Sequence, residues 1–206
     1  MKRLFLGISL ALSLVLYGCA MQKGVIDSFV EPTYQTGSIK TLAIFPVQNA
    51  SMAPAQANII NSKMVQAVQS KSTSITLISP AESARRINDA GIATQWTRFI
   101  EDFQTAGLVN KKYLSDIAKA LQSDAVLQGF IGNITQKDGM QFGDGIGITR
   151  VSIHYAIIDL HNAKIIWQAN SSGRVQTASF GYHMAPEVSE AMSVALKKLT
   201  DNLPAL

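Results

Sequence analysis

Cysteine is nearly absent from this chain, because its 206 residues include only Cys19. A single thiol excludes a framework of intrachain disulfides, so the hydrophobic core alone must hold the fold. Metal ligands are also scarce, since the three histidines, His154, His161 and His183, have neither the HxH nor the HxxxH spacing of a zinc site. We therefore expect no metal ion and no other cofactor.

Charged residues are few, at 16% of the chain, and no run of Lys or Arg is longer than two. The basic pairs after the amino terminus fall where solvated helix faces are expected, so nucleic acid is not a predicted partner. The adjacent acidic pair Glu101-Asp102 would diverge by about 100° on a helix and makes a poor catalytic dyad. No G-x-S-x-G nucleophile motif occurs either. We therefore predict that the protein is not an enzyme and has no catalytic residues.

Long apolar segments are limited to the amino terminus. Met1-Lys2-Arg3 supplies two cations, and residues 4–16 then run without a charge towards the small residue Gly18. This order is typical of a secretory signal peptide, and the uncharged run is shorter than the ~20 residues of a membrane-spanning helix. We expect residues 1–18 to be removed as a signal peptide, which takes Lys2 and Arg3 away and lowers the formal net charge from +4 to +2.

The end of this segment, Leu16-Tyr17-Gly18-Cys19, resembles the lipobox of bacterial lipoproteins. The resemblance implies cleavage between Gly18 and Cys19, a diacylglycerol on the Cys19 sulfur, and an acyl chain such as palmitate on the new amino group. Two or more chains give a stable membrane anchor. Ala20 follows in place of the aspartate that retains lipoproteins in the inner membrane, which implies an outer-membrane protein whose domain faces the periplasm. The alternatives are an ordinary signal peptide with a chance cysteine, or a buried free thiol.

Cleavage would leave 206 minus 18, or 188, residues, which suits one domain. We expect residues 19–38 to be the lipidated amino terminus and a tether, because this segment has mixed polarity and no sustained period. Partial docking of the tether is predicted by its apolar residues Val25, Ile26, Phe29 and Val30. Residues 39–206 would then form the periplasmic domain.

Residue periodicity divides this domain into strands and helices. Apolar β-type runs predict strands over 40–47, 74–78, 124–135, 148–160 and 164–171, the last with a possible extension to Gln176. Helices are predicted from Pro54, from Pro80 to Asp89 behind a capping Ser79, over 94–105, over 111–121, and from Pro186. The order predicts a single α/β (α+β) domain of three-layer type, with a mixed sheet, a β-meander and packed helices. The glycine-rich stretch 139–147 precedes a strand, which favours a hairpin loop over a phosphate cradle.

Three motifs resemble the family formed by the TolB amino-terminal domain, the curli secretion lipoprotein CsgG and the penicillin-binding-protein activator LpoB. They are LAIFPVQN at 42–49, AKALQSDAVLQGFI at 118–131 and IIDLHNAKIIW at 157–167. Gln122-Ser123 and Asn162-Ala163 stand where the family usually has Gly-Ala and Thr-Gly. The resemblance covers most of the chain after the signal and implies a periplasmic domain of this fold. We interpret motif residues such as Gly129 and Trp167 as determinants of the fold.

The anchor and the family resemblance together predict a non-enzymatic binding or scaffold component of a cell-envelope assembly, with an envelope protein as its partner. A first alternative is a subunit of a curli-type, CsgG-like secretion channel, which would make the chain a homo-oligomer. The hairpin over 136–149 is too short to supply the membrane-crossing strands of such channels. A second alternative is an LpoB-like activator of peptidoglycan synthesis. Those proteins carry a long proline-rich tether, whereas the segment 20–38 contains only Pro32.

Overall fold

The computed structural model describes residues 21–48, 54–72, 74–139, 145–177 and 183–206. They form one six-stranded sheet in the order β1-β6-β5-β4-β2-β3, with helices on both faces. The strands are β1 (Met21–Val30), β2 (Thr41–Ile44), β3 (Thr76–Ile78), β4 (Ala125–Lys137), β5 (Ile148–Asp159) and β6 (Ile165–Gln176). The helices are α2 (Pro54–Lys71), α3 (Pro80–Asp89), α4 (Ala93–Ala106), α5 (Lys111–Leu121) and α6 (Val188–Asp201). The α/β (α+β) class predicted from the sequence is confirmed.

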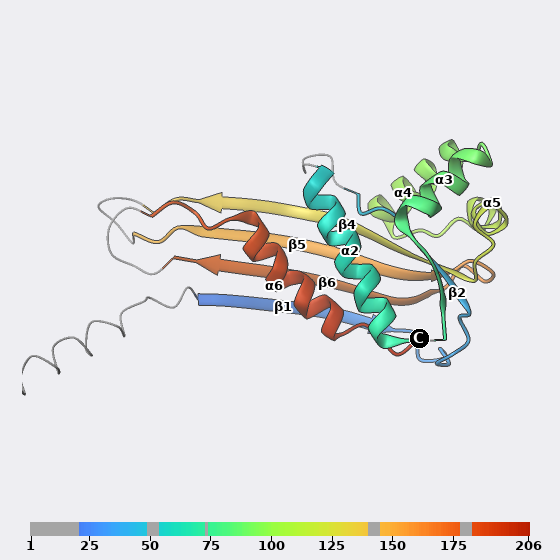
Figure 1. Cartoon of the computed structure of the whole chain (residues 1–206), viewed down its shortest axis with the longest axis horizontal. Helices are drawn as coiled ribbons and strands as arrows, with labels where there is room; N and C mark the ends of the chain where they lie inside the picture. Colours follow the sequence, from blue (N-terminus) through green and yellow to red (C-terminus); the bar gives the residue numbers. More distant parts are fainter. Residues whose placement is uncertain (1–20, 49–53, 73, 140–144, 178–182) are drawn as a thin grey trace, which may run out of the picture.

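The sheet has a parallel part and a longer antiparallel part. β2 pairs parallel with β3 and β4, whereas β4, β5, β6 and β1 pair antiparallel in turn. The four antiparallel strands have 10 to 13 residues, and β2 and β3 have only 4 and 3. The antiparallel strands therefore extend well beyond α3, α4 and α5, which Figure 1 shows at its right-hand side.

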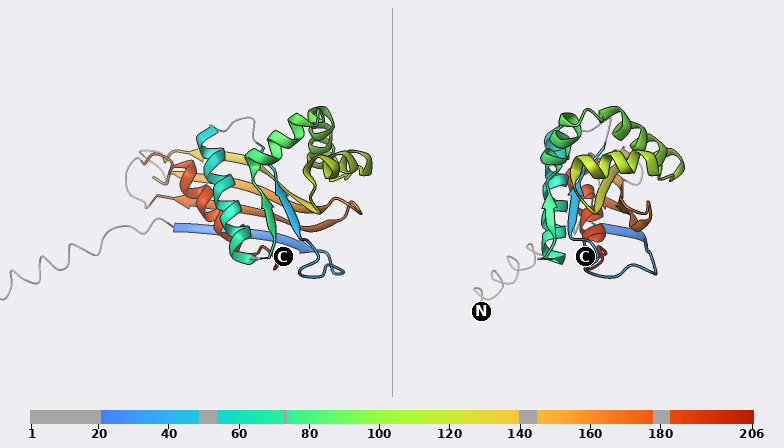
Figure 2. Two further views of the ribbon diagram at one scale, coloured as in Figure 1. Left: turned by 45° about the vertical axis from the view of Figure 1, so that its right-hand side comes forward. Right: turned by 90° about the vertical axis from the view of Figure 1, so that its right-hand side faces the viewer.

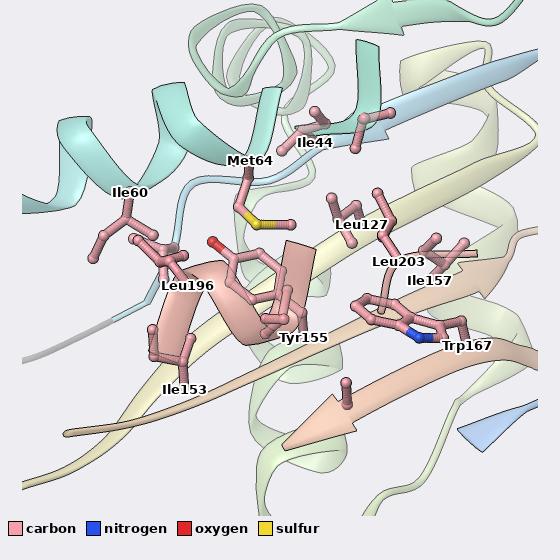
Figure 3. Close-up of a cluster of buried hydrophobic side chains, with 14 of the residues drawn as sticks. Ile44, Ile60, Met64, Leu127, Ile153, Tyr155, Ile157, Trp167, Leu196 and Leu203 are labelled. Carbon is pink, nitrogen blue, oxygen red and sulfur yellow. The ribbon is translucent and has the colours of Figure 1, made fainter. Parts of the chain in front are cut away.

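Helices cover the two faces of the sheet unequally (Figures 1 and 2). α2 and α6 pack along one face, while α3, α4 and α5 cover the other face only at one end. Alternation along β5 sends side chains into both layers. Tyr155 lies in the core with Met64 of α2 and Leu196 of α6, as Figure 3 shows, and its neighbour Ala156 packs under α4 and α5.

Local sequence signals produce the expected local structure. The Ser79 side chain accepts a hydrogen bond of 3.3 Å from the backbone N–H of Glu82 and so caps α3. The bounds of α5 are those predicted from its apolar stripe. A Cβ atom at Gly129 would lie 2.2 Å from the Tyr155 ring, so β4 requires glycine there for close packing, as the motif suggested.

The segment 21–30 differs from the sequence prediction. Where we expected a partly docked tether, these residues form β1, an edge strand paired with β6 along its whole length. Gly24 and Ile26 face α6 and the core, and neither provides a large buried side chain. The opposite positions Val25 and Phe29 are apolar but are 56% and 42% exposed. The apolar residues of β1 are thus largely on its solvent side. The strand therefore lacks the alternation of inward apolar and outward polar residues from which a strand is predicted.

Candidate functional site

The predicted lipid attachment site adjoins the first strand of the sheet. Leu16, Tyr17, Gly18 and Cys19 lie outside the described residues, and β1 begins at Met21. Two peptide units, which span at most about 7 Å, separate Cys19 from this strand. A lipid on Cys19 would hold the start of β1 next to the membrane surface. No helix within the described ranges is both long and apolar enough to cross a membrane.

The sheet face opposite α2 and α6 is uncovered where the antiparallel strands extend beyond α3, α4 and α5. Residues paired across neighbouring strands project from the same face and so form rows. Three such rows make up what we call the open face: Lys23, Arg174 and Arg150; Val25, Ser172 and Ser152; and Asp27, Asn170 and His154. All but Val25 are polar or charged, and none is buried. The open face is therefore a hydrophilic surface beside the predicted anchor.

A hollow of about 570 Å³ lies between α4 and β4. We call it the Trp96 hollow, and it is lined by Gln48, Trp96, Thr97, Ile100, Glu101, Gln104, Phe130 and Ile131. The Trp96 ring packs on Phe45 with a centroid distance of 5.5 Å, and its Nε1 atom is buried with no hydrogen-bond partner among the described residues. The indole N–H of Trp167, in the core, is also buried without a partner among the described residues, so this feature does not by itself mark a binding site. The hollow combines aromatic surface with the polar side chains of Glu101 and Gln104.

Phe130 separates the Trp96 hollow from a second hollow of about 320 Å³ on the open face. There the His154 ring stacks on Phe130 with a centroid distance of 4.5 Å, and its Nδ1 atom shares a hydrogen bond of 2.7 Å with Asn170 Oδ1. Burial lowers the pKa of His154 below its ordinary value, although the hydrogen bond to Asn170 opposes the shift. His154 therefore presents a neutral ring to this hollow near pH 7.

Asp124, which directly precedes β4, has a structural role. Asp124 accepts hydrogen bonds of 2.8 and 2.9 Å from the backbone N–H groups of Lys40 and Thr41, and so ties the start of β2 to β4. Burial raises the pKa of Asp124, but these bonds and His161 outweigh burial and hold the pKa below its usual value. His161 lies in the β5–β6 turn, and its Nε2 atom is 3.4 Å from Asp124 Oδ1. No group of three or more His, Cys, Asp or Glu among the described residues is arranged to bind a metal ion.

Sequence reasoning did not find the Trp96 hollow. Trp96 falls on the apolar side of a predicted helix together with Phe99 and Phe103, which favours a role in the core. Both phenylalanines are buried, but Trp96 lies at the rim of that core. Glu101, which we expected to be a poor member of a catalytic dyad, lines the same hollow. No local sequence pattern indicates the Trp96 hollow, because its other wall comes from β4, about 30 residues further along the chain.

Neither a protein-family model nor a curated protein sequence matches this chain. Solved structures do match: the PelC dodecamer from Paraburkholderia phytofirmans is 14% identical with a TM-score of 0.49, and the match covers 89% of this chain and 100% of that one. Lipoprotein GNA1162 from Neisseria meningitidis is 15% identical with a TM-score of 0.40, and the match covers 80% of this chain and 99% of that one. The LpoB C-terminal domain from Salmonella enterica is 14% identical with a TM-score of 0.40, and the match covers 68% of this chain and 85% of that one. At these identities and with TM-scores below 0.5, the similarities assign neither a family nor a function to this chain.

Proposed function

We propose that the protein is a lipid-anchored, non-enzymatic binding protein of the bacterial outer membrane, which presents its α/β domain to a partner protein in the periplasm. The observation that carries the proposal is the sequence Leu16-Tyr17-Gly18-Cys19 at the end of a signal-peptide pattern. The single cysteine of the chain stands at the position that lipid modification requires. Residues 1–18 would be removed, and Cys19 would become the first residue of the mature protein.

The short connection between Cys19 and β1 restricts where the partner can lie. A contour length of about 7 Å keeps the domain at the surface of the membrane that holds its lipid. A role across the cell wall, as for an LpoB-like activator, would need a much longer tether. We therefore favour a partner that is itself at the membrane surface, as a component of an envelope assembly.

The Trp96 hollow is the surface that we assign to this partner. It is open to solvent on one side and offers the aromatic rings of Trp96 and Phe130 with the carboxylate of Glu101. Trp is among the residues that carry much of the binding energy of protein interfaces when a partner covers them.

Replacement of the anchoring residue tests the first part of the proposal. Cys19→Ser should abolish incorporation of radiolabelled palmitate and leave the precursor uncleaved, because the modification needs the thiol. Mass spectrometry of the wild-type amino terminus should find the diacylglycerol and the added acyl chain on Cys19. If the Cys19→Ser variant still carries label and fractionates with the outer membrane, the anchor is elsewhere and the proposal is wrong.

Site-specific crosslinking in intact cells tests the second part. A photoreactive amino acid at Gln104, in the Trp96 hollow, should give a crosslinked product, and the same amino acid at the exposed Gln69 of α2 should not. Trp96→Ala should weaken the Gln104 product, because it removes the aromatic wall. The mass of the product distinguishes a different protein from a second copy of this chain. Equal products from both positions would reject the hollow as the binding surface.

A further inference from the structure

Three cations lie side by side on the open face, at the end of the sheet where β1 begins. Lys23 of β1 is paired with Arg174 of β6, and Arg174 is paired with Arg150 of β5. We call these three residues the basic row. Neighbouring strands are about 4.8 Å apart, so the outer members of the row are separated by about 10 Å. Thr135 of β4 continues the row without a charge.

Nothing within the described part of the chain balances the charge of the basic row. Its members take part in none of the ion pairs formed there. Arg174 donates a hydrogen bond of 2.8 Å to the neutral Gln176 side chain. On the open face the acidic residue is Asp27, four positions along β1 from Lys23 and therefore about 13 Å away. Like charges directly opposite one another destabilise a sheet, so folding does not explain the row.

The basic row lies close to the predicted anchor. Lys23 follows Cys19 by four residues, which is at most about 14 Å of chain. Arg174 and Arg150 follow at about 5 and 10 Å across the sheet. Val25 adjoins Lys23 on the same face and is 56% exposed, which adds an apolar contact beside the cations. A basic and apolar surface at this distance from a lipid would meet the head groups of the same membrane.

We propose that the basic row binds the anionic head groups of phospholipids in the membrane that holds the Cys19 lipid. The open face then rests against the bilayer at its β1 end, and the Trp96 hollow, beyond Phe130, remains accessible to a partner. The inference depends on the proposed lipid anchor. Each Lys or Arg near an anionic membrane surface changes the ratio of membrane-bound to free open face about fivefold. Two such residues therefore change it roughly 25-fold.

The mature lipidated protein, reconstituted in vesicles, tests this inference. Ser172→Cys places a thiol on the open face beside the row, where it can carry an environment-sensitive fluorophore. The vesicles consist of phosphatidylethanolamine with or without phosphatidylglycerol, and include a phospholipid whose spin-labelled head group quenches the fluorophore. A lipidated Cys19 cannot react with the fluorophore, so mass spectrometry of the labelled protein reports failure of the anchor separately from failure of head-group binding.

Matched variants identify the residues responsible. Lys23→Gln with Arg150→Gln removes two exposed cations and keeps the half-buried Arg174. Lys111→Gln with Lys119→Gln makes the same change in charge on α5, at the other end of the molecule in Figure 1. Thermal unfolding of each variant checks whether the fold is retained.

We expect strong quenching in vesicles with phosphatidylglycerol, and weak quenching without it or in 1 M salt, where the Debye length is about 3 Å. The row variant should lose the effect of phosphatidylglycerol, and the α5 variant should keep it. Equal quenching in both kinds of vesicle, or equal losses in the two variants, would overturn the inference. Self-quenching between fluorophores on different copies of the protein, independent of phosphatidylglycerol, would show that the open face binds a second copy. That result would also overturn the inference.

Discussion

At the scale of single residues, two positions carry a backbone conformation that their side chains disfavour. Gln122, after the last turn of α5, and Ala163, in the β5–β6 turn, have φ values of 52° and 62°. They are the non-glycine residues with positive φ among those described, and both stand where the resembled family usually has glycine. The left-handed region costs an L-residue roughly 1 kcal/mol, whereas glycine adopts it readily. The backbone at these two positions thus favours glycine, and Gln122 and Ala163 adopt the left-handed conformation with strain.

Gln122→Gly should relieve that strain. Because Gln122 is exposed and the substitution removes little packing, we expect the free energy of unfolding to rise by about 0.5 to 1 kcal/mol. Lys119→Gly, in the last turn of the same helix, is the control and should lower it by about 1 kcal/mol. Urea denaturation of the three proteins measures both changes. If Gln122→Gly lowers the free energy of unfolding as much as Lys119→Gly does, the backbone at position 122 is not left-handed.

At the scale of strands and helices, the basic row should weaken the sheet that carries it. Arg150→Gln removes the repulsion from Arg174 and should raise the free energy of unfolding by about 0.2 to 1 kcal/mol in low salt. The gain should disappear in 1 M salt, because screening already removes the repulsion there. Lys112→Gln on α5, with the same change in charge, should have no comparable effect. A loss of stability for Arg150→Gln in low salt would show that Arg150 has an attractive partner.

The sequence was sufficient for the elements whose signals are local. Ser79 with Pro80 marks the start of α3, and the apolar stripe of α5 sets both of its ends, because caps and stripes depend on residues a few positions apart. β1 could not be predicted in this way. Its inward side has Gly24 and the half-buried Ile26, and it becomes a strand only because β6 supplies a partner for every residue. Edge strands of this kind depend on a contact distant in sequence.

At the scale of the whole molecule, the open face and the Trp96 hollow result from a difference in length between the antiparallel strands and the helices that cover them. The antiparallel strands are longer than the helical layer formed by α3, α4 and α5, so part of one sheet face and the edge of α4 stay uncovered. Periodicity gives the length of each element but not how far one layer extends over another. The sequence therefore predicted the layers, and the surfaces between them had to come from the structure.

The length of the connection to the lipid should control the orientation of the whole domain. Insertion of about twelve Gly and Ser residues between Ala20 and Met21 would give a root-mean-square reach of roughly 19 Å. Unfolding should be unchanged, since no paired residue is altered, but quenching of the fluorophore at position 172 should fall. Insertion of a single Gly-Ser dipeptide is the control and should preserve most of the quenching. If the long insertion also preserves it, the basic row binds head groups without help from the short connection.

The pairing of β1 with β6 also sets an order of events in time. Met21 is paired with Gln176, and 176 minus 21 is 155 positions. In a lipoprotein exported amino terminus first, β1 would enter the periplasm long before its neighbour. Until β6 arrived, the segment after Cys19 would have no strand to join and would stay within reach of the enzymes that attach the lipid and cut the signal. Under the proposed anchor, the topology would therefore leave the amino terminus without a sheet partner for most of the time that export takes.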